Sequence, residues 1–203
     1  MQGARFVAAL GLTAALMALG GCAAVVVGGA AAGTALVAAD RRSTGVQVED
    51  EAIERRIGAA LARQFPQGSV NITAVSYNFR VLLVGQVPTE TARVEAERIA
   101  RETQNVRAVV NELTVGLIAG NASLANDAGI TALVRTTLTT TEGVPSGTIK
   151  VVTERNVVYL MGLVTPAEGE TAARAASRVN GVQRVVKVFE IVAAAPTAEP
   201  AKK

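Results

Sequence analysis

The sequence predicts an α+β protein built from two tandem copies of one αββαβ unit, each with a small three-stranded mixed sheet packed against two helices. The first observation is an internal repeat, because the residues that follow position 49 recur with an offset of 77. The second observation is that each copy changes from a four-residue apolar spacing, typical of a helix, to a continuous β-rich run, typical of a buried strand. The apolar residues paired between the copies include Ile53 and Ile130, Ile57 and Val134, Leu61 and Leu138, Ile72 and Ile149, and Leu83 and Leu160.

A helix opens each unit. In the first unit it is expected over residues 51–65, "EAIERRIGAALARQF", where the apolar residues form one stripe. Glu49 and Asp50 stand before this helix, where acidic side chains interact favourably with its dipole. Two strands are expected next, near residues 70–75 and in the run "RVLLVGQV". A second helix over about residues 89–103 and a last strand in "VVNELTV" complete the unit.

Two local features carry more specific expectations. At the second helix of the second unit, Thr165, Pro166 and Glu168 supply an N-cap, a first-turn proline and a capping-box acid. Gly85 and Gly162 occupy the same place in the two units, within the middle β-rich run. We interpret these glycines as a bulge or a close backbone approach; a ligand that approaches the backbone there is the alternative.

The first residues predict export and a lipid anchor. Arg5 precedes an apolar run, Phe6 to Leu19, which is typical of a secretory signal and shorter than the roughly 20 residues of a membrane-spanning helix. The run ends in "LGGC", where two glycines precede Cys22, the sole cysteine. This pattern resembles a bacterial lipoprotein box, which implies cleavage before Cys22 and its lipidation. Ala23 follows in place of an Asp, which favours the outer membrane. An ordinary signal peptide or an anchor helix with an incidental cysteine is the alternative.

The predicted organisation divides the chain into a leader, a tether, two units and a tail. The parts are a lipoprotein signal peptide over residues 1–21, a lipidated Cys22 with an Ala/Gly-rich tether over 22–48, a first unit over 49–115, a linker over 116–126, a second unit over 127–192 and a disordered tail over 193–203. Each unit is so small that it buries little apolar surface by itself. We therefore expect the units to pack against each other.

The composition argues against an enzyme and against a nucleic-acid binder. The 203 residues include no histidine and one cysteine, so the usual nucleophile–base pairs and most transition-metal sites cannot be assembled. We expect no metal and no cofactor. Although the sequence pI is about 9.4, the excess cations lie outside the units. Residues 49–115 carry nine acids and eight arginines, and residues 127–192 carry six acids and seven bases, so neither predicts a basic face for a phosphate backbone.

The repeated motifs resemble those of the BON-domain family. The resemblance rests on "LLVGQV" and "VYLMGLV" in the middle of the units, on "NVRAVVNELTV" and "GVQRVVKVFEIV" at their ends, and on the lipoprotein box before them. It implies a non-enzymatic lipoprotein on the periplasmic face of the outer membrane that supports envelope integrity. It also implies binding of anionic phospholipid through the second unit, association with division sites and a link to the outer-membrane protein assembly machinery. Relatives can carry an aromatic residue where this chain has Gly129.

The first helix of the second unit is the predicted phospholipid-binding surface. From Ala128 to Thr141 its only charge is Arg135, whereas the matching helix of the first unit carries five charged residues. Leu133 lies off the apolar stripe, and Arg135 is expected to meet a phosphate while Thr136 and Thr137 lie at headgroup level. A Thr-rich helix that is merely hydrated is the alternative.

The sequence leaves two function classes open. The first is a lipid-binding module that maintains the membrane. The second is a protein-interaction scaffold for the outer-membrane protein assembly machinery, in which only the anchor touches lipid. In the first class the first unit is chiefly structural, because its opening helix displays charged side chains that resist burial in lipid.

Overall fold

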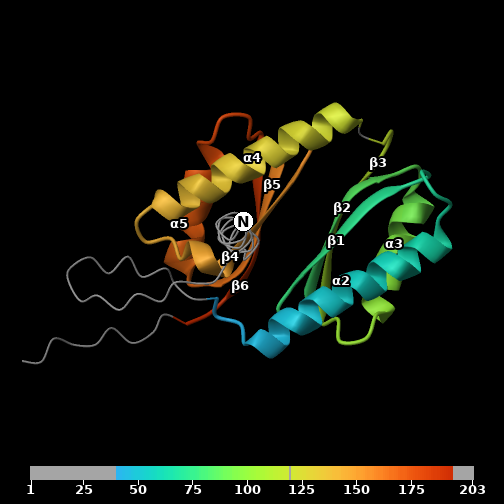
Figure 1. Cartoon of the computed structure of the whole chain (residues 1–203), viewed down its shortest axis with the longest axis horizontal. Coiled ribbons are helices and arrows are strands. Elements are labelled where there is room, and N and C mark those ends of the chain that lie inside the picture. The colour runs from blue at the N-terminus through green and yellow to red at the C-terminus, as the bar shows by residue number, and fades with distance from the viewer. Residues whose placement is uncertain (1–39, 119, 194–203) are drawn as a thin grey trace, which may run out of the picture. The chain divides into compact units, whose positions relative to one another are not determined.

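The computed structural model describes residues 40–118 and 120–193, which contain two αββαβ repeats in tandem (Figure 1). We call residues 44–115 the first repeat and residues 121–191 the second repeat. The predicted signal peptide, Cys22, most of the tether and the C-terminal tail lie outside the described residues. Among the described helices, none combines the length and the apolar character that a membrane span requires.

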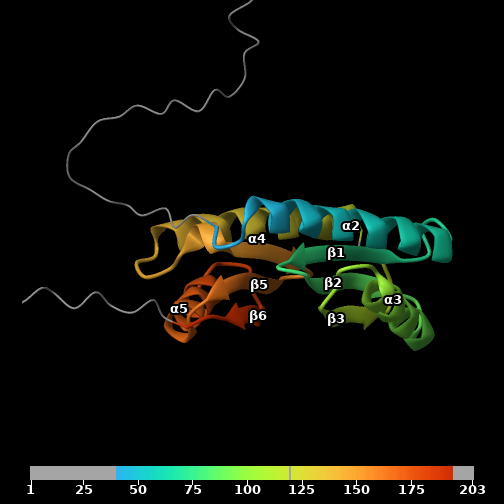
Figure 2. The ribbon, with the colours of Figure 1, turned by 90° about the horizontal axis from the view of Figure 1, so that it is seen from below.

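In the first repeat, two helices accompany a three-stranded sheet (Figures 1 and 2). The elements are α2 (Thr44–Gln64), β1 (Asn71–Tyr77), β2 (Arg80–Val87), α3 (Glu90–Glu102) and β3 (Ala108–Val115). The strands lie in the order β1-β2-β3, with β1 antiparallel and β3 parallel to β2. A hairpin joins the antiparallel pair, and α3 forms the crossover that the parallel pair requires.

The second repeat has the same order of elements. These are α4 (Asn121–Thr140), the short 3-10 helix η2 (Ser146–Thr148), β4 (Ile149–Glu154), β5 (Val157–Val164), α5 (Pro166–Ser177) and β6 (Arg184–Ile191). Its sheet, β4-β5-β6, repeats the antiparallel and parallel pairings of the first. The predicted α+β fold, with a small mixed sheet in each unit, is confirmed.

The central strands β2 and β5 are buried on both faces, which explains why the sequence shows continuous apolar runs there. In β2, Val81, Leu83 and Val87 belong to the core beneath the helices of the first repeat. The intervening Leu82 and Val84 belong to a different core on the opposite face of the sheet. Successive strand residues point to opposite faces, so a strand between two cores needs apolar residues throughout.

The second of these cores lies between the repeats, and we call it the seam. Its fully buried members from the two repeats are Val75, Tyr77, Leu82, Val84, Tyr159, Met161 and Val188. Polar contacts also cross it: the Tyr77 hydroxyl donates to the Thr148 carbonyl at 2.7 Å, and Lys150 Nζ lies 2.7 Å from Glu54 Oε1. The repeats therefore pack against each other, as their small size predicts.

Both opening helices begin earlier than the sequence suggested. α2 starts at Thr44, because the Ser43 hydroxyl caps it by accepting from Val46 N at 3.3 Å. The expectation that Glu49 and Asp50 precede the helix is therefore wrong, since both lie within it. Likewise α4 starts at Asn121, so that the second half of the predicted linker is helical.

The capping box of the second repeat is confirmed. The Thr165 hydroxyl accepts from Glu168 N at 3.3 Å, and Glu168 Oε2 accepts from Thr165 N at 2.7 Å. The close backbone approach at the paired glycines is also confirmed. A Cβ on Gly85 would lie 2.0 Å from the Asn71 carbonyl oxygen, and one on Gly162 would lie 2.6 Å from the Thr148 carbonyl oxygen. A structural requirement of each hairpin thus accounts for both glycines.

Candidate functional site

The outer surface of α4 is nearly free of charge. Its apolar stripe, Ile130, Val134 and Leu138, is buried in the core of the second repeat, as its spacing predicts. Leu133 is 54% exposed, and Arg135 is also exposed. The surface that α4 offers to a partner is therefore made of small, apolar and threonine side chains with one cation.

The threonine hydroxyls on this surface are already hydrogen-bonded to the helix. Thr136 Oγ1 donates to the Ala132 carbonyl at 3.1 Å, and Thr137 Oγ1 donates to the Leu133 carbonyl at 2.9 Å. Such bonds to the preceding turn satisfy the hydroxyl without water. Removing water from this face therefore costs less free energy than it would for hydroxyls that depend on solvent.

The structure does not bring the predicted Leu133 and Arg135 side chains to one point. Residues of an α-helix follow each other at about 100° around the axis, so these two lie about 160° apart. They flank an exposed ridge that includes Ala132 and Thr136. Arg135 Nη2 lies 3.4 Å from the Val151 carbonyl oxygen, which holds it beside β4. The four predicted residues thus form a broad strip along the helix.

The matching helix of the first repeat, α2, has charged side chains that form hydrogen bonds and ion pairs within the protein. Glu54 accepts from Ser76 N at 2.8 Å as well as from Lys150 of the second repeat. Arg56 forms an ion pair with Glu49. Several charges of α2 are therefore committed to intramolecular contacts, and the helix presents a charged outer surface that α4 lacks.

A buried carboxylate, whose role the sequence did not predict, fixes the first hairpin. Asp50 accepts hydrogen bonds from Asn78 N and Phe79 N, both at 2.8 Å, at the turn between β1 and β2. It also accepts from the Ser76 hydroxyl and from Arg42 Nη1, both at 2.7 Å. Asp50 therefore ties the first helix, the hairpin and the end of the tether together.

Asp127 repeats this arrangement in the second repeat. Its carboxylate accepts from Arg155 N at 2.8 Å and from Asn156 N at 2.9 Å, at the turn between β4 and β5. The turn residues have positive φ angles in both repeats, so their amides point towards the helix instead of a strand partner. The signal was present in the sequence, because Asp50 and Asp127 align at the offset of 77.

A model of the BON domain matches residues 49–116 and again residues 126–193. The chain belongs to the BON-domain family. Each match covers one αββαβ repeat, so the structural duplication and the family assignment agree.

Several curated relatives are similar to this chain over much of their length. Outer membrane lipoprotein DolP of Haemophilus influenzae is 39% identical over 175 residues, which are 85% of this chain and 89% of the relative. The 21 kDa hemolysin of Actinobacillus pleuropneumoniae is 35% identical over 154 residues, 75% of this chain and 79% of the relative. Osmotically-inducible protein Y of Escherichia coli is 30% identical over 144 residues, 68% of this chain and 70% of the relative.

The end of the tether binds across both BON repeats. We call residues 40–42 the strap. Arg41 forms a bidentate pair with Glu168 at 2.8 and 2.9 Å and also donates to the Leu163 carbonyl at 2.7 Å. The hydrogen bond from Arg41 lowers the pKa of Glu168, which keeps that carboxylate ionised at neutral pH. The chain thus reaches the second BON repeat before it forms the first.

The other strap residues hold the first BON repeat. The Arg42 guanidinium lies 3.7 Å from the centre of the Tyr77 ring and pairs with Asp40 and Asp50. Burial, together with the nearby Asp40 charge, raises the pKa of Tyr77 to about 12. Its hydroxyl therefore stays protonated and able to donate to Thr148 across the seam.

The acidic side chains of the BON pair serve structural contacts. Within residues 40–118 and 120–193, no group of three or more His, Cys, Asp and Glu side chains is arranged to hold a metal ion. The buried carboxylates Asp50 and Asp127 are engaged in structural hydrogen bonds. The strip on α4, with Arg135 as its sole charge, remains the best candidate for an external partner.

Proposed function

We propose that this chain is a lipid-anchored protein on the periplasmic face of the outer membrane that binds anionic phospholipid through its second BON repeat. In this role it supports envelope integrity, including at division sites. The proposal is supported by the relative named as an outer membrane lipoprotein, at 39% identity over 85% of the chain. The single observation that carries the lipid contact is the outer face of α4, which is free of acidic side chains and carries one cation, Arg135.

The anchor part of the proposal rests on Cys22, which lies outside the described residues. It follows the apolar run and two glycines, and three acyl chains at this point would hold the protein firmly at a bilayer. Labelled palmitate should enter the wild-type chain and should not enter a Cys22→Ser variant. Equal labelling of both proteins would contradict lipidation at this residue.

The lipid-contact part of the proposal follows from the difference between the two opening helices. From Ala128 to Thr141 the sole charge is a cation, Arg135, and the hydroxyls of Thr136 and Thr137 are satisfied within the helix. A cation near an anionic membrane surface contributes about 1 kcal/mol. Exposed Leu133 adds apolar area that can enter the headgroup boundary. The result is a weak interfacial contact that the anchor makes effective.

Replacing Leu133 and Arg135 with Glu is expected to weaken vesicle binding by the unlipidated protein. The double variant removes the apolar contact and changes the charge of the strip by three units. Since each charge near the surface contributes about 1 kcal/mol, we expect affinity for phosphatidylglycerol vesicles to fall at least about tenfold. Vesicle co-sedimentation of the mature chain carrying Cys22→Ala measures it, after circular dichroism has confirmed folding.

A matched control places the same charge change on the first repeat. Arg55→Glu with Gly58→Glu alters two exposed positions of α2 by three charge units, and Gly58 has open space around it. This control should keep at least half of the wild-type affinity. Unchanged binding by the folded α4 variant would remove this helix as the lipid site. If the wild-type domains bind no vesicles but capture components of the outer-membrane protein assembly machinery, the scaffold function is supported instead.

A further inference from the structure

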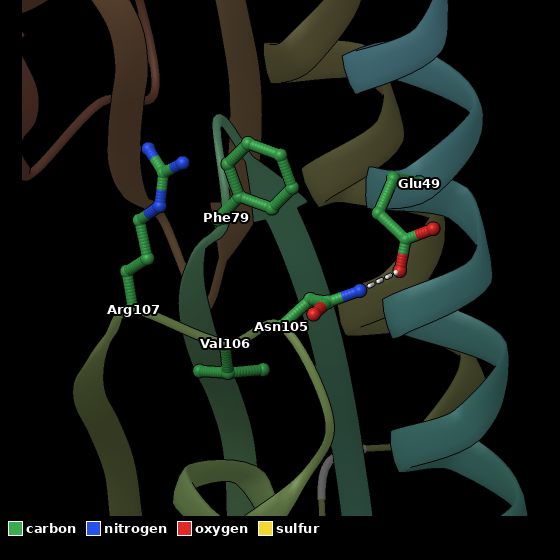
Figure 3. Close-up of a pocket in the computed structure, with 5 residues that line it drawn as sticks. All are labelled: Glu49, Phe79, Asn105, Val106 and Arg107. Atoms are coloured by element: carbon green, nitrogen blue, oxygen red, sulfur yellow. Dashed lines mark hydrogen bonds between the residues drawn. The ribbon is translucent and has the colours of Figure 1, made fainter.

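The first repeat contains a pocket that the proposed function does not use (Figure 3). It has a volume of about 540 Å³ and lies between α2, the β1–β2 turn and the segment before β3. Glu49, Phe79, Asn105, Val106 and Arg107 line it. Figure 3 shows Phe79 between Arg107 and Glu49, so that the pocket has an apolar centre with opposite charges on its two sides.

The second repeat has a hydrogen bond at the corresponding place that the first repeat lacks. Arg107 N donates to the Phe79 carbonyl, and Gln183 N donates to the Asn156 carbonyl, both at 2.9 Å, so the backbones correspond. In the second repeat, Asn156 Nδ2 also donates to the Gly181 carbonyl at 2.9 Å and ties the two segments together. Phe79 stands at the place of Asn156 and cannot form that bond. The two segments that line the pocket of the first repeat therefore lack the tie that joins their counterparts in the second repeat.

Phe79 is also an unfavourable residue for its backbone conformation. Its φ of 65° matches the φ of 65° at Asn156, but this left-handed region suits Asn far better than Phe. Asn105, in the opposite segment, has a φ of 68°, and its counterpart Gly181 has a φ of 90°, so that conformation belongs to the turn shared by both repeats and only Phe79 is strained. Strained residues that persist in a fold tend to gather at binding sites. The ring does contribute packing to the first core, yet it also forms the centre of the open pocket.

The charges of the pocket favour a monoanion. The Arg107 guanidinium lies 4.2 Å from the centre of the Phe79 ring, and no carboxylate among the described residues pairs with it. Arg107 is exposed, and its guanidinium has five N–H donors that can bind a bidentate acceptor. On the other side Glu49 accepts from Asn105 Nδ2 at 3.0 Å, and hydrogen bonds from Asn105 and Arg56 lower the pKa of Glu49. The ionised Glu49 carboxylate repels a dianion such as phosphate more strongly than it repels a monoanion.

We propose that the pocket of the first repeat binds a carboxylate attached to an apolar group. The N–H edge of Arg107 donates to the carboxylate, and the apolar group lies against Phe79 and Val106. This gives the first repeat a binding role of its own, separate from the lipid contact of α4. The inference does not depend on lipid binding, because all five lining residues belong to the first repeat.

Titration with N-acetyl-phenylalanine tests the site, because this probe carries both a carboxylate and an apolar ring. Amide chemical shifts of Val106 and Arg107 are followed in the mature chain carrying Cys22→Ala. Saturable shifts are expected. N-acetyl-phenylalaninamide, acetate and inorganic phosphate should each bind at least about tenfold more weakly, since each lacks one feature or adds a second charge. Equal affinity for the acid and its amide would overturn the proposal, as would shifts that never saturate.

Two variants replace a residue of the pocket with the residue found at the matching position of the second repeat. Arg107→Gln, which installs the residue found at Gln183, should weaken binding of N-acetyl-phenylalanine at least about tenfold. Phe79→Asn should abolish the site while keeping the turn, because Asn156 supports the same φ. Arg174→Gln, at an exposed arginine of α5, is the control and should bind as the wild type does. If Phe79→Asn does not fold, Arg107→Gln decides, and undiminished binding by that folded variant rejects the site.

Discussion

Asp50→Ala should lower the free energy of unfolding by about 3–5 kcal/mol, the loss typical of breaking a buried ion pair by removing one partner. The side chains of Asp50 and Arg42 are only 3% and 12% exposed. Alanine would leave the amides of Asn78 and Phe79 without their acceptor and would leave Arg42 with Asp40 alone. Urea unfolding followed by circular dichroism measures the change.

Asp127→Ala is the internal comparison for this prediction. Asp127 holds the same two turn amides but has no ion pair among the described residues. Leaving these two half-buried donors without their acceptor is expected to cost about 2 kcal/mol, less than the loss at Asp50. Equal losses at the two positions would show that Arg42 adds nothing to the stability of the first hairpin.

Gly85→Ala is expected to destabilise the first repeat by about 4 kcal/mol. A Cβ at this residue would lie 2.0 Å from the Asn71 carbonyl oxygen, and the φ of 121° is strained for any side chain. Backbone strain contributes about 1–3 kcal/mol, and the displacement of packed atoms contributes a similar amount. Because the contact is with backbone of β1, it cannot be relieved by a side-chain rotation. Thermal and urea unfolding both measure this loss.

The same substitution at Gly129 is expected to have the opposite effect on stability. No atom lies within 4 Å of the Cβ that it would gain, and Gly129 is an exposed residue inside α4. Alanine there should stabilise the protein by about 0.5–1 kcal/mol through helix propensity. A loss of stability at Gly129, or a loss below about 1 kcal/mol at Gly85, would contradict the assigned roles of these glycines.

The repeat and the fold could be predicted because they depend on local, periodic signals. The apolar stripe of each opening helix, the β-rich central strands and the capping box at Thr165 all appear as patterns within a few residues of sequence. The close approach at Gly85 and Gly162 was predictable for the same reason, since the repeat places glycine at both hairpins. Family membership followed from these motifs.

The parts that could not be predicted depend on tertiary contacts. Asp50 was interpreted as a residue before the helix, because nothing local shows that Ser43 begins the helix well upstream or that a distant turn needs an acceptor. The candidate strip on α4 was located by comparing charges between the repeats. The sequence did not reveal that Leu133 and Arg135 flank a ridge, or that a pocket opens where Phe79 replaces the tie made by Asn156.

The strap decides where a mechanical pull on the proposed lipid anchor would enter the fold. Tension applied upstream of Asp40 would first reach Asp40, which accepts from the Tyr77 hydroxyl of the first repeat at 3.3 Å. It would then reach Arg41, whose three hydrogen bonds end on Leu163 and Glu168 of the second repeat. It would then reach Arg42, which is bound to Asp50 of the first repeat. The load is therefore divided between both repeats before it can unwind the first turn of α2. An outward force on the anchor would act on the two BON repeats as one mechanical body.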